Sequence, residues 1–481
     1  MVTPGSESGR PHAQDLTVGH PRFGPLRPRL VLATCCISLF IVGMDNTIIN
    51  VTLPSIQREL GASISQLQWV VDAYLLVLAA LLIFSGSLGD RVGRAKIFQV
   101  GLVLFAAASL SCGLAPNVGV LIACRALQGV GGSMLNPVAL SIIRETFEDP
   151  KRRAQAIGVW GGVIGVSMGI GPVLGGFLVH FVTWRAVFFI NVPVAIAAII
   201  LTYCFVPESR AGRSRRPDPM GQVLVFLTLG SLVFAVIEAP RLGWDSGPII
   251  GGFVLAAAAG IVVVRYELRR TDPLIEMRVF RSPAFSAATS IAVLAFYVLA
   301  GYMFLLTLYL QDTRGFDALH AGLFLLPNAL AMFICAPLSG RLVGNFGPRP
   351  SMLIGGMSLT LSALMLIGLD TRTSDLVILG AGALVGVGSG FVNAAITTTA
   401  VSGLPASEAG VAAGIASASR QVGSVLGVAV VGMLASNSTR MVGTDPGVWL
   451  TLVAAGAAII IVTLITTRLG RDHQKIPTPA V

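Results

Sequence analysis

Three ionisable side chains interrupt long apolar runs of the chain, where a charge is costly. Asp45, Asp72 and Arg125 each lie among aliphatic residues, and insertion scales put the cost of such a group at the centre of a membrane helix at about 2.5–3.5 kcal/mol. Desolvation favours the neutral form of a carboxyl group, whereas a nearby cation favours the charged form. A carboxyl group under both influences can take up and release a proton, so these residues predict proton-coupling chemistry.

The three residues are expected at similar depths if the apolar runs are helices that cross a bilayer alternately. Asp45 lies about nine residues before the outer end of its run, or ~13 Å at 1.5 Å per residue. Asp72 and Arg125 lie ~9 Å and ~10 Å from the outer ends of theirs. The sequence therefore predicts one polar layer in the outer half of the membrane.

Each of the three residues also has a purely structural interpretation. Asp72 lies near the start of its helix, where the helix dipole favours negative charge. Arg125 could have no role beyond a hydrogen bond to carbonyl groups of a neighbouring helix, and Asp45 could have no role beyond joining two helices.

Arg420, near the middle of a later apolar run without an acidic residue, could line a cavity or hydrogen-bond carbonyl groups. Other polar residues within the apolar runs are candidates for lining a substrate cavity, and with Arg420 the set is Asn50, Tyr74, Gln128, Asn136, Asn393 and Arg420.

The composition of the chain defines the elements that must position these residues. Of 481 residues, 54% are hydrophobic and only 12% are charged, against about 25% charged in soluble domains. The mean hydropathy is +0.81. These values exclude a soluble enzyme, a disordered chain and a secreted disulfide scaffold. They predict an all-α membrane protein built from helices of about 20 apolar residues.

The apolar runs predict fourteen transmembrane helices arranged as six, two and six. We expect a tail at 1–29, a six-helix bundle at 30–206, a linker with two inserted helices at 207–284, a second six-helix bundle at 285–468 and a tail at 469–481. The predicted helices are 30–53, 67–88, 97–115, 118–143, 154–178, 186–206, 221–238, 248–265, 285–311, 318–343, 351–369, 374–401, 409–434 and 447–468.

The basic residues predict the orientation of these helices. With the N-terminus inside, inner loops and tails hold 25 of the 33 Lys and Arg residues, and outer loops hold six. Such a bias is the positive-inside rule. It predicts that both termini are cytoplasmic and that the protein lies in the plasma membrane. It also explains the net charge of +10 without a nucleic-acid partner.

Two sequence patterns occur once in each half of the chain. Residues 86–96, Gly-Ser-Leu-Gly-Asp-Arg-Val-Gly-Arg-Ala-Lys, recur in degenerate form at 340–350. Residues 129–136, Gly-Val-Gly-Gly-Ser-Met-Leu-Asn, recur at 386–393 as Gly-Val-Gly-Ser-Gly-Phe-Val-Asn. Repeated halves are typical of secondary transporters, which bind substrate near the midplane between the halves.

The chain resembles the major facilitator superfamily, and in particular its 14-span drug:proton antiporters, over residues 30–468. The similar motifs are Asp45-Asn-Thr-Ile-Ile-Asn-Val-Thr-Leu-Pro54, Trp69-Val-Val-Asp72-Ala-Tyr74, residues 86–96, Arg125-Ala-Leu-Gln128-Gly129, Gly171-Pro172-Val-Leu-Gly175-Gly176 and Trp184-Arg185-Ala-Val-Phe-Phe-Ile-Asn191-Val-Pro193. Ser167 stands where a further glycine is common in the antiporter motif.

The resemblance implies proton-coupled efflux of amphipathic or lipophilic small molecules, such as drugs or antibiotics, by alternating access. Residues of the 86–96 loop would latch the two bundles on the cytoplasmic side when the cavity opens outward: Gly86, Asp90, Arg91, Gly93 and Arg94. The antiporter motif (Gly171, Pro172, Gly175 and Gly176) would either pack helices or seal the interface between the bundles. Alternatives are export of an endogenous metabolite or lipid-like product, and a non-transporting membrane sensor on a transporter scaffold.

The expected partners are a small-molecule substrate, protons and the lipid bilayer, with the chain acting as a monomer. No nucleotide-binding Gly-rich motif, zinc-ligand pattern or haem-ligand pattern occurs in the sequence. No nucleophile and base occur in a recognisable catalytic pattern either. We therefore expect neither a cofactor nor a metal, and no enzymatic activity.

Overall fold

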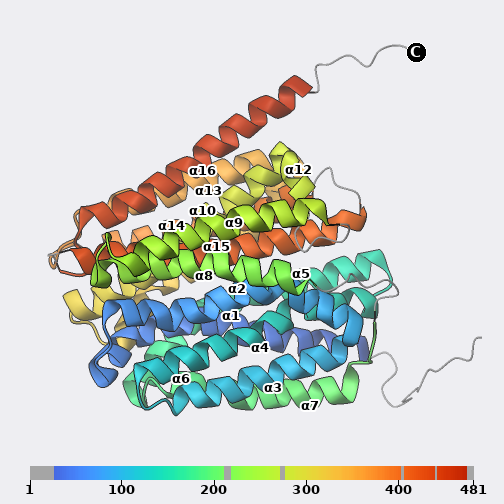
Figure 1. Cartoon of the computed structure of the whole chain (residues 1–481), viewed down its shortest axis with the longest axis horizontal. Helices are drawn as coiled ribbons and strands as arrows, with labels where there is room; N and C mark the ends of the chain where they lie inside the picture. The colour runs from blue at the N-terminus through green and yellow to red at the C-terminus, as the bar shows by residue number, and fades with distance from the viewer. Residues whose placement is uncertain (1–26, 211–217, 271–276, 402–405, 439–440, 474–481) are drawn as a thin grey trace, which may run out of the picture.

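The computed structural model describes residues 27–210, 218–270, 277–401, 406–438 and 441–473, and within these ranges it contains helices and no strand (Figure 1). The predicted tails fall largely outside the described residues, at 1–26 and 474–481. The predicted boundaries between tails, bundles and linker therefore remain predictions. The all-α fold class is confirmed.

The first half of the chain forms seven helices. Local sequence explains several of their starts: Ser63 and Gln66 form a capping box before α2, and the Asp149 side chain accepts a hydrogen bond at the start of α5, where Pro150 takes the first position. The helices are α1 (Arg27–Leu60), α2 (Ile64–Val92), α3 (Arg94–Gly113), α4 (Val118–Thr146), α5 (Pro150–Phe181), α6 (Ala186–Phe189) and α7 (Asn191–Phe205). The short α6 and α7 together occupy the predicted sixth span.

The inserted pair and the second half follow. The inserted helices are α8 (Pro219–Leu242) and α9 (Gly247–Arg269). A short 3-10 helix, η2 (Met277–Arg281), precedes α10 (Pro283–Leu308), which continues as a π-helical turn, η3 (Tyr309–Thr313). The remaining helices are α11 (Ala318–Phe324), α12 (Leu326–Phe346), α13 (Pro348–Met365), α14 (Asp375–Val401), α15 (Ala406–Asn437) and α16 (Pro446–His473).

Thirteen helical segments within the described ranges are long and apolar enough to cross a membrane. They correspond to thirteen of the predicted spans. The remaining prediction, 351–369, falls on α13, which has only 18 residues and begins with Pro348, Arg349 and Pro350. The count of fourteen and the cytoplasmic placement of both termini therefore remain predictions.

Contacts between helix ends show that neighbouring helices alternate in direction. At one end, Arg27 Nε of α1 donates to the carbonyl oxygen of Phe205 at the end of α7 (3.3 Å). At the other end, Trp184 Nε1 donates to Glu59 Oε2 at the end of α1 (2.6 Å). We call the first the inner end and the second the outer end, following the predicted orientation.

Each half of the chain has a main hydrophobic core, and the two cores meet where residues of α10 and α15, such as Phe304 and Val428, pack with the first half. Figure 1 shows the blue and cyan helices of the first half together in the lower part of the view, and the orange and red helices of the second half in the upper part. Helix α8 packs against both α2 of the first half and α15 of the second. The architecture is therefore two bundles with an inserted helical hairpin along one side.

Candidate functional site

Asp45 lies at the centre of a buried hydrogen-bonded network inside the first bundle. Arg125 Nη1 of α4 lies 2.5 Å from Asp45 Oδ2, and both side chains are 1% exposed. Gln128 Nε2 and Asn191 Nδ2 donate to Asp45 Oδ1 at 2.9 and 3.0 Å. A buried charge is tolerated when it is paired and its remaining lone pairs are satisfied, and this carboxylate meets both conditions.

Arg125 is held from several sides as well. Its Nε donates to the carbonyl oxygen of Val70 in α2 (3.0 Å), and its guanidinium group lies 4.3 Å from the ring centroid of Tyr74. Helices α2 and α4 approach each other closely beside Arg125. Glycine at position 129 permits this approach, since a Cβ there would lie only 2.7 Å from the carbonyl oxygen of Tyr74. Arg125 therefore pairs with the acid and also hydrogen-bonds a carbonyl group of a neighbouring helix.

Two members of this network were not among the predicted site residues. Asn191, the first residue of α7, also donates to Ser109 Oγ (3.1 Å), and that hydroxyl donates to the carbonyl oxygen of Phe188 (2.9 Å). Asn191 belongs to a motif that the sequence already displays, so its spacing after Trp184 could have indicated it. Ser109 lies in an Ala/Ser-rich stretch of α3 and carries no such signal.

Asp72 is buried but does not join the network. Its two carboxylate oxygens have no hydrogen-bond partner among the described residues. Gln68, one turn earlier, donates from Nε2 to the carbonyl oxygen of Ala429 in α15 (2.8 Å), and Trp69 donates to Glu238 of α8 (3.0 Å). Residues three and four apart share a helix face, which places Asp72 where α2, α8 and α15 meet. The dipole of a helix acts mainly within its first turn. Because α2 begins at Ile64, Asp72 lies beyond that turn, and the helix dipole does not explain its position.

We expect Asp72→Asn to preserve or raise the thermal stability of the protein. The substitution removes a carboxylate that is buried without a partner, while keeping its shape. Gradient-driven transport should fall less than in a variant of Asp45, and to a degree that depends on the substrate. Thermal unfolding and transport by the same preparation check both expectations, and a large loss of stability would contradict the first.

A cavity of about 850 Å³ lies between the two bundles. Four of the predicted cavity residues line it: Asn50, Asn136, Asn393 and Arg420. Tyr74 and Gln128 do not line it, because they pack around Arg125 inside the first bundle. The wall also contains Asn46, Trp160 and Phe296, and it reaches Asp90 and Arg144 at the inner end. The cavity therefore opens inward in this conformation.

Arg420 lies on the wall that the second bundle contributes. Its Nη2 donates to Thr397 Oγ1 (2.6 Å) and lies 3.5 Å from the carbonyl oxygen of Asn393. Within the described part of the chain it has no carboxylate partner, and its Nε lacks a hydrogen-bond partner. Both interpretations of Arg420 thus hold together, since it lines the cavity and also hydrogen-bonds the protein.

The predicted latch residues lie at the inner mouth of the cavity. Arg94 forms an ion pair with Asp90 (2.8 Å) and another with Glu145 of α4, while Arg91 is exposed. The ion pairs described for Asp90 and Arg94 thus stay within the first bundle. A latch between bundles remains a prediction for the outward-open conformation.

The two predicted latch glycines, Gly86 and Gly93, permit close approaches. Gly86 faces α4, where its Cβ would lie 3.3 Å from Pro137 Cβ. Gly93 has φ +136°, which favours glycine. Glu208, in the segment after α7, fills the space beside Gly93 and accepts hydrogen bonds from the backbone nitrogens of Ala95 and Lys96 (3.1 Å each). No feature of the sequence indicates that this carboxylate lies at the start of α3.

The antiporter-like motif lies at the junction of α1, α5 and α11. Gly171 and Gly175 face α1, where a Cβ would contact Thr47 and Ile48. Gly176 faces the second bundle, where a Cβ would lie 2.5 Å from the carbonyl oxygen of Ala318, and the carbonyl oxygen of Pro172 lies against Gly322. The glycines therefore pack helices within one bundle and also join the two bundles in the outer half.

Polar contacts accompany this packing at the outer side. Gln311 Nε2 of η3 donates to the carbonyl oxygen of Val51 in α1 (2.9 Å). Asp317, before α11, lies 3.8 Å from His180 Nδ1 of α5. The backbone N–H of His320 donates to Asp317 and lowers the pKa of its carboxyl group, so Asp317 stays charged at neutral pH. These contacts close the outer side in the inward-open conformation.

We expect Gly176→Ala to weaken this closure. The added methyl group would meet backbone atoms of Ala318 and Leu319 at 2.5 and 2.9 Å, and these cannot rotate away as a side chain could. The two bundles would therefore separate at the outer side, which favours outward-open states. Labelling of a cysteine introduced at Thr47 by a membrane-impermeant reagent from outside should increase, and unchanged labelling would contradict the expectation.

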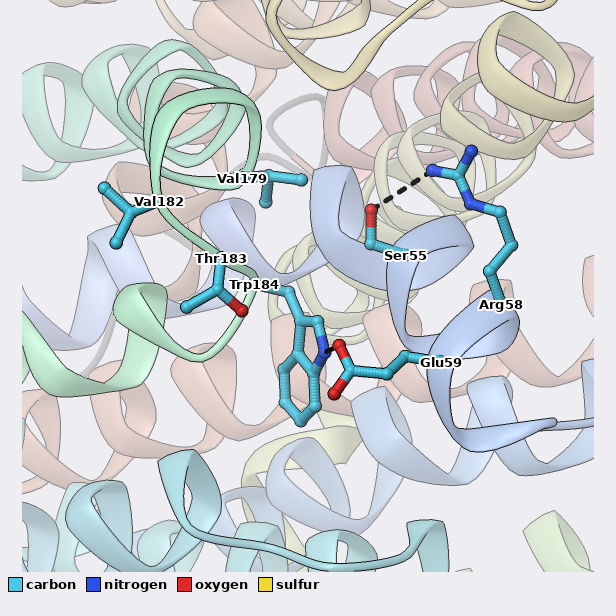
Figure 2. Close-up of a pocket in the computed structure, with 7 residues that line it drawn as sticks. All are labelled: Ser55, Arg58, Glu59, Val179, Val182, Thr183 and Trp184. Carbon is cyan, nitrogen blue, oxygen red and sulfur yellow. Dashed lines mark hydrogen bonds between the residues drawn. The ribbon is translucent and has the colours of Figure 1, made fainter.

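A smaller pocket of about 340 Å³ lies at the outer end, away from the Asp45 network. Figure 2 shows Trp184 reaching toward Glu59, with Arg58 bonded to Ser55 beside them. Glu59 also forms an ion pair with Arg185. This cluster ties the end of α1 to the segment between α5 and α6. The pocket is lined by Ser55, Arg58, Glu59, Val179, Val182, Thr183 and Trp184.

Comparison with known protein families assigns the chain to one of them. A model described as the Major Facilitator Superfamily matches residues 35–428. The chain belongs to the Major Facilitator Superfamily. As a superfamily member with many spanning helices, it is a transporter-type protein of the plasma membrane.

Several superfamily relatives are similar over most of their length. The chain is 38% identical to "Multidrug resistance protein Stp" of Mycobacterium tuberculosis, over 84% of this chain and 75% of the relative. It is 37% identical to the "Tetracenomycin C resistance and export protein" of Streptomyces glaucescens, over 87% and 78%. It is 32% identical to a methylenomycin A resistance protein of Streptomyces coelicolor, over 89% of both.

A solved structure shares the fold. The crystal structure of a bacterial homologue of the human lysosomal transporter Spinster, in an inward-facing and occupied conformation, aligns with a TM-score of 0.65. The alignment covers 95% of this chain and 99% of the other at 15% identity. This similarity supports the two-bundle architecture.

Proposed function

We propose that this protein is an efflux transporter that exchanges protons for amphipathic or lipophilic small molecules, such as drugs or antibiotics, by alternating access. The observation that carries the proposal is the position of Asp45 on α1. Its carboxylate pairs with Arg125 behind the cavity wall, and its neighbours Asn46 and Asn50 on the same helix line the cavity. A proton on Asp45 and a substrate in the cavity would thus act on one helix.

Protonation of Asp45 would remove the charge that balances Arg125. The network would then rearrange, and α1 would shift against its neighbours. Helix α1 packs on Gly171 and Gly175 of α5, and the same stretch of α5 contacts α11 of the second bundle. A change at Asp45 therefore has a contiguous path of packed helices to the outer closure.

The inner mouth would close as the outer side opens. In that state Asp90, Arg91 and Arg94 would latch the two bundles. Gly93 would permit the tight turn that presents them, and Gly86 would permit the close approach of α2 to α4. The cavity and the Asp45 network both lie within one chain, so we expect the monomer to be the working unit.

The cavity suits a drug-sized amphipathic molecule. A volume near 850 Å³ lies in the range of ~300–1,000 Å³ that is usual for ligand sites. Its wall combines apolar residues such as Met168 and Met303 with the ring of Phe296 and the unpartnered Nε of Arg420. A substrate with an apolar body and a hydrogen-bond acceptor would match this wall.

The names of the relatives support drugs and antibiotics as the substrate class. One relative is named for both resistance to and export of tetracenomycin C. Export of an endogenous product is therefore the second candidate function, and both functions use the same cavity and coupling.

Transport in proteoliposomes with an imposed pH gradient tests the proposal. Candidate substrates come from a susceptibility panel that compares a deletion strain with an overexpressing strain. We expect uphill transport that follows the gradient and stops when a protonophore collapses it. Transport that is indifferent to the gradient would contradict proton coupling.

A further inference from the structure

Helices α5 and α12 belong to different bundles and contact each other in the outer half of the molecule. A Cβ at Gly169 of α5 would lie 3.2 Å from Ala329 Cβ of α12. Closer to the outer end, Gly176 of α5 lies against Ala318 of α11. This seam between the bundles is therefore closed from the outer end to about the middle of the molecule.

The same seam is open in the inner half. Gly158 and Gly162 lie on the helix face that also carries Gly169 and Gly176, because the spacings of four and seven residues return to one side of a helix. A Cβ at Gly158 or Gly162 would have nothing within 4 Å. On α12, Gly340 follows Ala329 by three turns and also has nothing within 4 Å. The two helices thus diverge toward the inner end.

The main cavity extends to this divergence. Ile157 and Trp160 of α5 line it from one side of the seam, and Met332 and Ala336 of α12 line it from the other. The indole Nε1 of Trp160 is buried and has no hydrogen-bond partner among the described residues. The open part of the seam therefore leads into the cavity that we assign to the substrate.

The opposite seam, between α2 and α15, is covered. Helix α8 packs against both helices, and Gln222 Nε2 of α8 donates to the carbonyl oxygen of Ala80 in α2 (2.5 Å). At the other end of α8, Ser65 Oγ of α2 donates to the carbonyl oxygen of Ile237 (3.3 Å). In the described ranges no comparable helix covers the seam between α5 and α12. Of the two seams, the described helices thus leave the one between α5 and α12 uncovered.

The surface around the open seam matches an amphipathic molecule dissolved in the inner leaflet. Val159 and Val166 of α5, together with Phe333 and Ile334 of α12, are exposed beside it. Basic residues lie at the inner end of both helices, where Lys151 and Arg152 begin α5 and Arg341 lies near the end of α12; all three are exposed. Apolar chains would pack between the helices, and polar or acidic groups would remain at the basic interface.

We propose that the inner half of the α5–α12 seam is a lateral entrance, through which amphipathic molecules pass from the inner leaflet into the cavity. The role of this entrance in efflux rests on the proposed function. Helix α8 of the inserted hairpin covers the seam between α2 and α15, so among the described residues the proposed entrance lies on one side of the molecule.

Photolabelling by a lipid in the bilayer tests this entrance without a transport assay. The full-length protein is reconstituted into phosphatidylethanolamine vesicles that contain phosphatidylglycerol with a diazirine on one acyl chain. After illumination, we expect peptides labelled on Ile157, Trp160 or Met332, which face the cavity, as well as on the outward-facing Val166. Label on Val166 with none on the three cavity residues would overturn the proposal.

A bulky residue in the gap provides the matched comparison. Gly162→Phe should abolish labelling of the cavity residues while Val166 stays labelled, and Gly340→Phe should do the same from the facing helix. The control is Gly251→Phe on α9, which also has nothing within 4 Å but lies away from the seam, and it should leave all labelling unchanged. Cavity labelling that persists in both seam variants would overturn the proposal. Cavity labelling in a wild-type protein that exports nothing would instead contradict the proposed function and leave the entrance supported.

Discussion

Asp45→Asn is expected to lower gradient-driven export at least about tenfold, equivalent to ~1.4 kcal/mol in the barrier. Asn keeps the size of the side chain but cannot titrate. The carboxylate accepts from Arg125, Gln128 and Asn191, and an amide group can satisfy only part of that set. Export of a substrate from energised proteoliposomes, compared at equal protein content, measures the loss.

The structure also predicts a cost in stability for this variant. Arg125 would keep its bonds to Val70 and Gln128 but would lose its counter-charge, and breaking a buried ion pair costs about 3–5 kcal/mol. The double variant Asp45→Asn/Arg125→Gln removes both charges and should recover folded yield without recovering coupling. Uphill transport that is unimpaired in folded Asp45→Asn would remove Asp45 from the mechanism.

Gly171→Val is the second substitution with a large expected effect. A Cβ at this position would contact Thr47 Oγ1 and lie 3.2 Å from the carbonyl oxygen of Met44, so the larger side chain must displace α1 from α5. Overpacking of this kind costs about 1–3 kcal/mol. Because Asp45 lies between Met44 and Thr47 in the chain, the displacement should also disturb its network. Both thermal stability and transport should fall strongly.

A matched control separates local packing from a general effect of valine in a membrane helix. Gly251→Val on α9 adds the same side chain where nothing lies within 4 Å. We expect this variant to retain wild-type stability and transport. Equal losses in the two variants would show that contact with α1 is not the reason for the effect of Gly171→Val.

The sequence predicts the helices well because membrane helices are defined by length and hydrophobicity. It also predicts the depth of charged residues, and Asp45 and Arg125 do meet in one layer. It does not define which side of a helix faces which neighbour. For this reason Asp72, which has a similar expected depth, lies beside α8 and α15 instead of in the network, and Tyr74 and Gln128 pack around Arg125 instead of lining the cavity.

Contacts between distant segments are the other part that the sequence does not reveal. Glu208 caps α3 from more than a hundred residues away, and Ser109 joins the Asp45 network from a stretch of small residues. Neither residue has a distinctive spacing relative to its partners. The motif glycines of α5 illustrate the intermediate case, since their spacing indicates close packing but not that Gly176 meets the second bundle.

Proton release on substrate binding tests the central claim most directly. Purified protein in weakly buffered detergent solution is mixed with an exported substrate, and the change in pH is followed with an indicator dye. The proposed mechanism predicts release of protons by the wild-type protein and loss of that release in the double variant Asp45→Asn/Arg125→Gln at saturating substrate. Equal release by the two proteins would contradict the assignment of Asp45 as the coupling group.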